Sequence, residues 1–396
     1  MSWNSPWTPS AAAPITADAI RAVLESLANN KILGTDLDTT GDVFTIDADL
    51  DLLGHDLLNA ANVPTGIVNA KSLGVLGNGT TDDTDAIRNA IAHISNDGHG
   101  VLFFPSGTYL INDSVTLRIN QSIWGAGGST IFKLGGDSTS VDPGFILRTV
   151  GTIKDISFVG GASGTGATTR PGIRVETGDR CKIDNITASL CGCIVDAQAG
   201  VTGLSITDSL AKTCTDGIRA TGVRGLKVSG LTVLDPLTSG ATLIGCHDIS
   251  VSGSGVYGSL GNGFSFSGCS GEVTVSSNKA ALGGILLDGC NGLSLIGCHS
   301  IDSTFSGNDD APGIHLSSCS NCIVTASMSR LNTTTNQKMT CALRVSGGGY
   351  NSINGNVLGP VYLAGTPPTL SYLSSLCYVN TGSDTTIEYG NFQVVL

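Results

Sequence analysis

The chain has few charged residues, few aromatic residues and little proline. Of its 396 residues, 13% are charged, 5% are aromatic and 12 are proline, whereas 54 are glycine. Low proline and the lack of a three-residue period exclude a collagen-like chain, and 40% hydrophobic residues exclude wholesale disorder. No apolar run is long enough to span a bilayer, so we expect no membrane insertion.

Several functional signals are also missing. The first residues, MSWNSPWTPSAAAP, lack the basic and apolar regions of a secretory signal, so we expect synthesis in a reducing cytoplasm and 12 cysteines that remain thiols. A net charge of −12 disfavours nucleic acid as a partner. Because no phosphate-binding loop, dinucleotide fingerprint or complete zinc pattern is present, we expect no cofactor and no metal.

What the sequence does contain is a repeat. Short motifs of the form Gly-apolar-x-apolar begin at residues 217, 240, 263, 284 and 313, in steps of 23, 23, 21 and 29 residues. Each unit holds a second alternating run, such as LKVSGLTV (226–233), and no unit has helical periodicity. A repeat of this length predicts an all-β fold, a β-solenoid in which each coil buries its face against the next.

The cysteines support this register. Cys246, Cys269, Cys290 and Cys319 each follow the opening glycine of their coil by six residues. Equal offsets in successive coils predict an interior column of thiols, one above another at about 4.8 Å.

Residues 71–117 carry the motifs LGVLGNGTTDDTDAI and GVLFFPSGTYLI. This segment resembles the first part of the pectate-lyase-like superfamily of right-handed parallel β-helices, which is common in phage tailspikes. The resemblance implies a right-handed parallel β-helix with a helix near 84–96 that covers the open end of the first coil. Asp82 and Asp83 are adjacent acids, and we interpret them as helix caps rather than as catalytic groups.

Upstream, FTIDADLDLLGHDLLNAANVP (44–64) is similar to a strand-turn segment of phage tail fibres, and residues 15–30 predict an amphipathic helix. The two resemblances imply a homotrimer located in the virion, in the phage tail, and bound to a tail or baseplate protein through residues 1–66. The predicted divisions are 1–66 for virion attachment, 67–135 for the first coils and capping helix, 136–360 for the β-helix coils and 361–396 for C-terminal cap and trimerisation strands.

The third residue of each Gly-apolar-x-apolar motif should point outward, because side chains alternate along a strand. The expected outward column is Arg174, Arg219, Leu243, Ser265, Leu286, His315 and Arg344. The longest coil adds an acidic loop, STFSGNDDAPG (303–313), just before His315. We expect a catalytic cluster of Asp288, Asp309, Asp310 and His315, because glycoside hydrolysis uses paired carboxylates. A plain turn is the structural alternative for this loop.

Substrate binding is predicted for two outward arginines, one outward serine and two aromatic residues in turns or loops: Arg219, Arg344, Ser317, Phe305 and Tyr257. TDGI (215–218) is similar to part of a polygalacturonase motif, but the rest of that motif is missing. Two functions remain open. One is a tailspike that recognises and depolymerises bacterial surface polysaccharide, as a glycoside hydrolase or lyase. The other is a non-catalytic adhesin or structural spike on the same scaffold.

Overall fold

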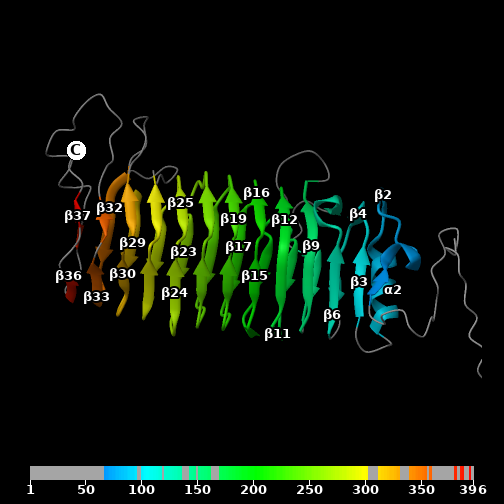
Figure 1. The fold of residues 1–396 in the computed structure, drawn as a ribbon, viewed down its shortest axis with the longest axis horizontal. Coiled ribbons are helices and arrows are strands. Elements are labelled where there is room, and N and C mark those ends of the chain that lie inside the picture. Colours follow the sequence, from blue (N-terminus) through cyan, green and yellow to red (C-terminus); the bar gives the residue numbers. More distant parts are fainter. Residues whose placement is uncertain are drawn as a thin grey trace, which may run out of the picture. The chain divides into compact units, whose positions relative to one another are not determined.

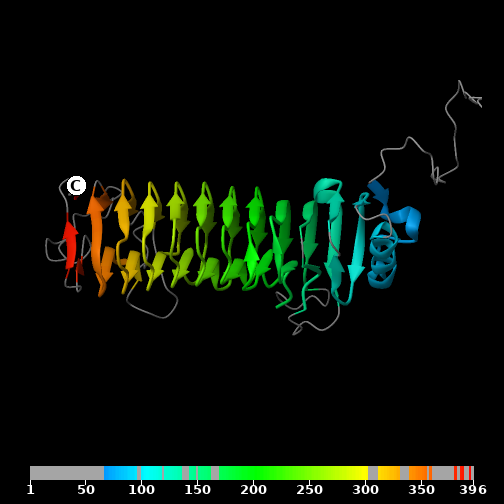
Figure 2. The same ribbon diagram turned by 90° about the horizontal axis from the view of Figure 1, so that it is seen from below.

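The computed structural model describes residues 67–95, 100–117, 120–135, 142–148, 150–161, 169–301, 311–330, 339–354, 356–358, 379–380, 384–387 and 392–393. All of them belong to one compact unit, Leu58–Leu396. Parallel strands succeed one another along this unit, and each coil contributes a strand to each of three faces (Figures 1 and 2). The fold is a right-handed parallel β-helix, which confirms the predicted class.

Two of the faces are ladders that share the strands β9 (Thr152–Val159) and β12 (Lys182–Ser189). The first ladder also contains β1 (Ile67–Asn69), β3 (Gly100–Phe104), β6 (Gln121–Gly125), β15 (Ser205–Thr207), β18 (Lys227–Ser229), β21 (Ser250–Ser252), β24 (Val273–Ser276), β27 (Leu293–Ile296), β30 (Ile323–Thr325), β33 (Gly349–Asn354) and β36 (Asp384–Ile387). The second contains β2 (Asn78–Asp82), β4 (Gly107–Ile111), β7 (Thr130–Leu134), β16 (Leu210–Lys212), β19 (Thr232–Leu234), β22 (Gly255–Tyr257), β25 (Lys279–Ala281), β28 (His299–Ile301), β31 (Met328–Arg330), β34 (Val357–Leu358) and β37 (Phe392–Gln393).

The third face is an eleven-stranded sheet. Its strands are β5 (Val115–Leu117), β8 (Phe145–Leu147), β10 (Ile173–Val175), β13 (Val195–Ala197), β17 (Asp216–Thr221), β20 (Ser239–Ile244), β23 (Phe264–Ser267), β26 (Ile285–Asp288), β29 (Ala311–Ser317), β32 (Met339–Ser346) and β35 (Val379–Asn380). Ile218 pairs with Ala241, and Ala241 pairs with Phe264. These register partners are one predicted repeat apart, which confirms the repeat. A short pair, β11 (Gly178–Asp179) and β14 (Val201–Thr202), lies outside the three faces.

The predicted capping helix is present as α2 (Thr84–Ser95), next to two short 3-10 helices, η1 (Ala70–Leu73) and η2 (Gly127–Ser129). Its apolar side chains Ile87, Ile91 and Ile94 are buried. The helix lies at the N-terminal end of the stacked strands (Figure 1). It therefore covers strand edges that would otherwise be open for pairing with another chain.

The interior is filled by inward side chains from all three faces. An aromatic cluster of Phe104, Tyr109, Phe132, Phe145 and Phe158 occupies the first coils, and all five side chains are fully buried. The ring of Phe132 contacts the other four, with centroid separations of 4.9 to 5.9 Å. Later coils use smaller residues, including the cysteines.

The predicted thiol column is confirmed. The residue that follows Cys269, Cys290 or Cys319 donates its backbone amide to the carbonyl of the cysteine one coil earlier. The four cysteines therefore occupy equivalent positions in successive coils. Ten cysteines are described, and all are free and buried.

These thiols are expected to resist alkylation. Burial shields them and raises the pKa of Cys181 to about 11, and the reactive species is the thiolate. Iodoacetamide at pH 8, followed by peptide mapping, should leave the ten described cysteines unmodified in native protein and modify all of them in guanidinium. Fast native labelling of Cys269 or Cys290 would contradict the interior column.

Three parts of the predicted organisation have different outcomes. The attachment segment 1–66 lies outside the described residues. Beyond residue 360, the described strands β35, β36 and β37 pair with β32, β33 and β34 and continue the three faces. A trimerisation role for that region stays a prediction.

Candidate active site on the eleven-stranded sheet

The strand register defines which side chains point outward from the eleven-stranded sheet. In coil order the column is Arg174, Asp196, Arg219, Thr242, Ser265, Leu286, His315 and Arg344. The predicted column contained Leu243, which is wrong. Leu243 is the fourth residue of its motif and is fully buried, so Thr242 takes the outward position. The predicted column also passed over Asp196.

Three side chains at one end of this column, Arg174, Asp196 and Arg219, form an acid–arginine cluster with Asp216, which begins β17. Arg174 Nε donates to Asp196 Oδ2 at 3.1 Å. Arg219 Nε lies 3.8 Å from Asp196 Oδ1 and 3.8 Å from Asp216 Oδ2. The two carboxylate oxygens on either side of Arg219 therefore lie no further apart than twice that distance.

Both acids are nearly buried although they lie on an outward face. Asp196 is 8% exposed and Asp216 is 7% exposed. Burial raises the pKa of Asp216, against the opposing effects of the Arg219 charge and of the Ser239 amide, which donates to Oδ1 at 3.2 Å. The raised pKa of Asp216 beside the ion-paired Asp196 gives the two carboxyl groups different environments, as pairs of acids in acid–base catalysis have.

In the two coils beyond the cluster, the side chains of this column are polar and uncharged. Ser239 pairs with Asp216, and Asn262 occupies the equivalent position one coil later. Thr242 and Ser265 continue the column that contains Arg219. We call Ser239, Thr242, Asn262 and Ser265 the polar strip.

The predicted catalytic cluster is described only in part. The register pairs Asp288 with Ser317 and places His315 beside Leu286, so Asp288 is diagonal to His315 as expected. His315 Nε2 forms a hydrogen bond of 2.7 Å with Ser346 Oγ. Asp309, Asp310 and Phe305 lie outside the described residues, so their convergence on His315 stays a prediction. Asp288 lies three coils from Arg219, roughly 14 Å along the stack.

The predicted substrate-binding residues separate between faces. Arg219 belongs to the acid–arginine cluster, and Ser317 and Arg344 lie on β29 and β32 of the same sheet. Tyr257 ends β22 in the second ladder, where Lys279 Nζ lies 5.3 Å from its ring centroid. Tyr257 and Arg219 are therefore on different faces of the coil.

Sequence reasoning missed Asp196 and Asp216. Asp196 lies in CIVD (193–196), where Ile194 rather than a glycine takes the register position of Gly217, and Asp216 lies in TDGI (215–218). The available signal was an acid between Arg174 and Arg219 at the same outward position. The two arginines seemed scattered in the sequence, but the coils place them on either side of Asp196.

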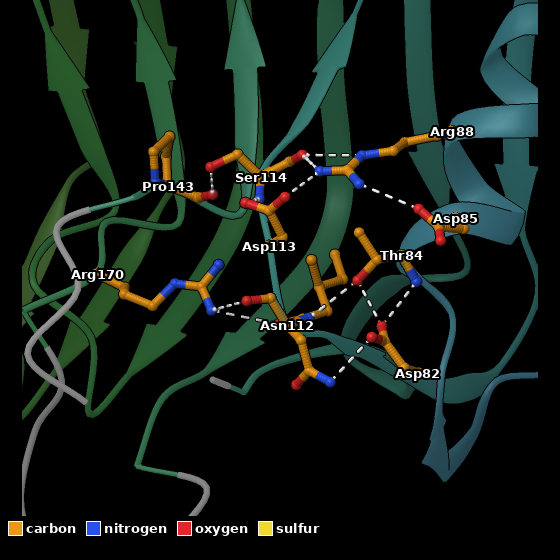
Figure 3. Close-up of polar contacts among 10 residues, drawn as sticks. Asp82, Thr84, Asp85, Arg88, Asn112, Asp113, Ser114, Pro143 and Arg170 are labelled. Carbon is orange, nitrogen blue, oxygen red and sulfur yellow. Dashed lines mark hydrogen bonds and ion pairs between the residues drawn. The ribbon is translucent and has the colours of Figure 1, made fainter. Parts of the chain in front are cut away.

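Of the adjacent acids before α2, Asp82 binds the first amide of the helix as a cap does, whereas the Asp83 carboxylate binds the preceding turn and not the helix. Asp82 Oδ1 accepts from the Thr84 amide at 2.9 Å, and Oδ2 accepts from Asn112 Nδ2 at 2.9 Å (Figure 3). Asp83 is 1% exposed and accepts from the amides of Leu76 and Gly77 at 2.8 and 3.1 Å. These bonds tie the helix to the first coils.

Arg88 extends the same network from the helix. It donates to Asp85 and Asp113 and to the Ser114 carbonyl (Figure 3). Arg170 lies nearby, 1% exposed, and donates to the carbonyls of Asn112 and Gly135. These bonds join α2 to the turn after β4 and to the next coils, which favours a structural role for this network.

Asp83→Ala is expected to lower the free energy of unfolding by about 2–3 kcal/mol, because two buried amides lose a charged acceptor. Guanidinium denaturation measures the effect. An unchanged free energy of unfolding would contradict a structural role for the Asp83 carboxylate.

Within the described residues, no group of three or more His, Cys, Asp or Glu side chains is arranged to hold a metal ion. In the same residues, no helix combines the length and the apolar character needed to cross a membrane.

Comparison with known proteins agrees with the fold. Residues 67–143 match the family "Rhamnogalacturonase A/epimerase, pectate lyase-like". DFA-IIIase from Arthrobacter chlorophenolicus A6 superposes with a TM-score of 0.64 at 15% identity, over 81% of this chain and 94% of that chain. The A-module of mannuronan C-5 epimerase AlgE6 from Azotobacter vinelandii gives a TM-score of 0.53 at 15% identity, over 82% and 99%. The family likeness is thus confined to the first coils, and the structural likeness shows the right-handed parallel β-helix fold.

Among curated relatives, mannuronan C5-epimerase AlgE3 of A. vinelandii is 32% identical over 130 residues, 30% of this chain and 6% of that protein. Alginate lyase 7 of the same organism is 39% identical over 74 residues, 17% of this chain and 9% of that protein. The chain thus spans less than a tenth of the length of either relative.

Proposed function

We propose that this chain is a phage tailspike that binds a bacterial surface polysaccharide and hydrolyses it at the acid–arginine cluster. The observation that carries the proposal is a pair of nearly buried carboxyl groups, Asp196 and Asp216, on either side of Arg219 on an outward sheet. Asp216 acts as the general acid, and Asp196 acts as the base or nucleophile.

The chemistry follows from the two environments. Burial keeps a proton on Asp216 to higher pH than on an ordinary aspartate, and that proton can pass to the leaving glycosidic oxygen. Asp196, ion-paired with Arg174, is the carboxylate that attacks the anomeric carbon or activates water. Glycosidases separate such groups by about 5–5.5 Å for retention and about 6.5–9.5 Å for inversion. The upper limit on the Asp196–Asp216 separation is compatible with either outcome.

Two further observations support a polysaccharide ligand and a tail location. The partial relatives named above are enzymes of mannuronan and alginate, which are polysaccharides. The segments 44–64 and 71–117 resemble phage tail fibres and tailspikes. We therefore include in the proposal a homotrimer in the virion, attached to a tail or baseplate protein through residues 1–66. Light scattering should give three times the mass of one chain.

The test is product release. Purified full-length protein is incubated with a panel of capsular, lipopolysaccharide and exopolysaccharide preparations, and new reducing ends and oligosaccharides are measured. Hydrolysis adds water and leaves no unsaturated sugar, whereas a lyase would create absorbance near 232 nm. Binding without any product would favour the non-catalytic adhesin, and binding to none of the glycans would reject the proposal.

A further inference from the structure

A serine and a histidine form a hydrogen-bonded pair at the corner between the eleven-stranded sheet and the first ladder. Ser270 Oγ lies 2.7 Å from His247 Nδ1. His247 lies between β20 and β21, and Ser270 occupies the equivalent position one coil later, between β23 and β24. The pair is separate from the acid–arginine cluster and from the polar strip. Both residues are half-buried, so part of the pair is open to solvent.

The hydrogen bond fits the pairing of a nucleophile with its base. When the ring proton of His247 is on Nε2, Nδ1 accepts from the Ser270 hydroxyl. A serine hydroxyl is a weak nucleophile unless a base at about 2.6–3.2 Å takes its proton. Among the described residues, neither side chain has another hydrogen-bond partner, so their shared proton is not held by a third group.

The backbone amide that follows Ser270 is also available. Backbone bridges connect His247 to Ser270 and resume only from Asn291 onward, so this column of bridges is interrupted after Ser270 in the described part of the chain. At the interruption Gly271 is exposed, with φ 81°, and its N–H donates to no acceptor in that same part. In serine hydrolases the N–H of the residue after the nucleophile stabilises the oxyanion. The Gly271 N–H is in the chain position for that role.

The surroundings of the pair indicate a small acyl group. Gly245 and Gly268 precede the pair in their coils, and a Cβ added at either would meet no atom within 4 Å, so the approach is open. Asp248 and Glu272, which follow the pair, are exposed acids. Ile244, at the end of β20, is apolar and 47% exposed. One such side chain can cover a short acyl group, whereas a long acyl chain would remain in water.

We propose that Ser270 is an acyl-transfer nucleophile that hydrolyses carboxylate esters of short-chain acids, with His247 as general base and the Gly271 N–H as oxyanion donor. Ser270 Oγ attacks the ester carbonyl carbon, and its proton passes to His247 Nδ1. The bond from that carbon to the alcohol oxygen then breaks, and the leaving alkoxide takes the proton. Water attacks the acyl-serine, gives a proton through His247 to Ser270 Oγ, and releases the free acid. This activity is additional to glycan cleavage at the acid–arginine cluster.

Two reagents test the nucleophile in purified full-length protein. A fluorophosphonate reacts with an activated serine and leaves a stable adduct, which tandem mass spectrometry assigns to one residue. p-Nitrophenyl acetate reports turnover through release of p-nitrophenolate. The expected results are an adduct on Ser270 and ester hydrolysis that Ser270→Ala lowers by about a hundredfold. Hydrolysis of p-nitrophenyl octanoate should be much slower than hydrolysis of the acetate.

Ser320 provides the matched control. It lies in the same corner column as Ser270, but its neighbour one coil earlier is Asn291 rather than a histidine, and the amide after it, Asn321 N–H, is already bonded. Ser320→Ala should therefore leave labelling and hydrolysis unchanged. His247→Gln should lower the labelling rate of Ser270 by about a hundredfold, because the base is lost. Thermal melting verifies that each variant folds.

Several outcomes would overturn the proposal. Labelling of Ser270 in the wild-type chain that is no faster than labelling of Ser320 would reject an activated serine, and this result does not depend on the folding of any variant. Hydrolysis that His247→Gln removes but Ser270→Ala retains would show that the imidazole acts without the serine. Labelling that survives His247→Gln would reject the histidine as base. Glycan cleavage is measured separately, so none of these results decides the proposed function.

Discussion

Asp216→Asn is expected to lower the rate of glycan cleavage at least a hundredfold while the protein stays folded and still binds glycan. An amide cannot transfer a proton to the leaving oxygen, and a positioned general acid contributes about 10²–10⁴-fold to rate. Asp196→Asn should cause a loss of similar size, because it removes the base or nucleophile. Initial rates of reducing-end release, normalised to bound glycan, measure both.

The control for charge is Asp184→Asn. Asp184 lies on β12 in the ladder strands, where its carboxylate accepts from Thr207 and lies 3.4 Å from Lys182 Nζ. It matches Asp216 in chemistry but faces away from the eleven-stranded sheet. Equal losses in the two variants would contradict a specific role for Asp216. A loss confined to Asp288→Asn, Asp309→Asn or Asp310→Asn would instead move catalysis to the cluster predicted from sequence.

The raised pKa of Asp216 also has a pH signature. The acid holds its proton more tightly in the native state than in the unfolded chain, where its pKa is near 3.8. Native protein then binds more protons in the interval above 3.8, so the free energy of unfolding falls as pH rises through the native pKa. Asp216→Asn should remove this part of the pH dependence. In the wild type, the alkaline limb of kcat/KM should lie above the ordinary aspartate range.

Phe132→Ala is expected to lower the free energy of unfolding by about 3–5 kcal/mol, the largest stability effect predicted for this chain. The ring is fully buried and contacts four other aromatic rings, so truncation removes their packing and leaves a cavity. These rings fill the coils beneath α2. Equilibrium denaturation in guanidinium, followed by far-ultraviolet circular dichroism, measures the loss.

Two substitutions calibrate that result. Phe132→Leu keeps most of the volume and should cost less than half as much. Leu260→Ala removes an apolar side chain that is 52% exposed and should change stability by no more than about 0.5 kcal/mol. If Phe132→Ala were no more destabilising than Leu260→Ala, the aromatic cluster would not be a determinant of stability.

Much of the fold was predictable because it depends on patterns that extend over only one strand or one coil of the sequence. Alternation gave the strands, the spacing of glycines gave the coil length, and the constant offset of Cys246, Cys269, Cys290 and Cys319 gave the register. Residues 71–117 then supplied the handedness through their resemblance. The bounds of α2 followed from Ile87, Ile91 and Ile94 at helical spacing.

The candidate site was harder to predict, because its residues come from three coils and the repeat motif is not equally clear in all of them. The strand that contains Asp196 does not begin with the glycine of the Gly-apolar-x-apolar motif. The motif therefore did not place Asp196 in the outward column. Asp216 precedes its motif and reaches the face only because β17 begins there. Burial of the two acids depends on the neighbouring coils, and no local pattern encodes it. The sequence analysis instead placed the catalytic residues at the loop 303–313, which contains Asp309 and Asp310 and lies largely outside the described residues.

The three connections within a coil are not equally variable. In every coil from the one with β15 and β16 to the one with β30 and β31, two residues connect the first-ladder strand to the second-ladder strand. The connection from the second ladder to the eleven-stranded sheet instead ranges from three residues before β17 or β26 to thirteen before β10 and twenty before β35. Asp216 opens a strand at that corner, and Asn262 precedes one. Insertions at this corner alone can therefore remodel the surroundings of the acid–arginine cluster without altering strand pairing, which offers a route to new binding specificities on an unchanged scaffold.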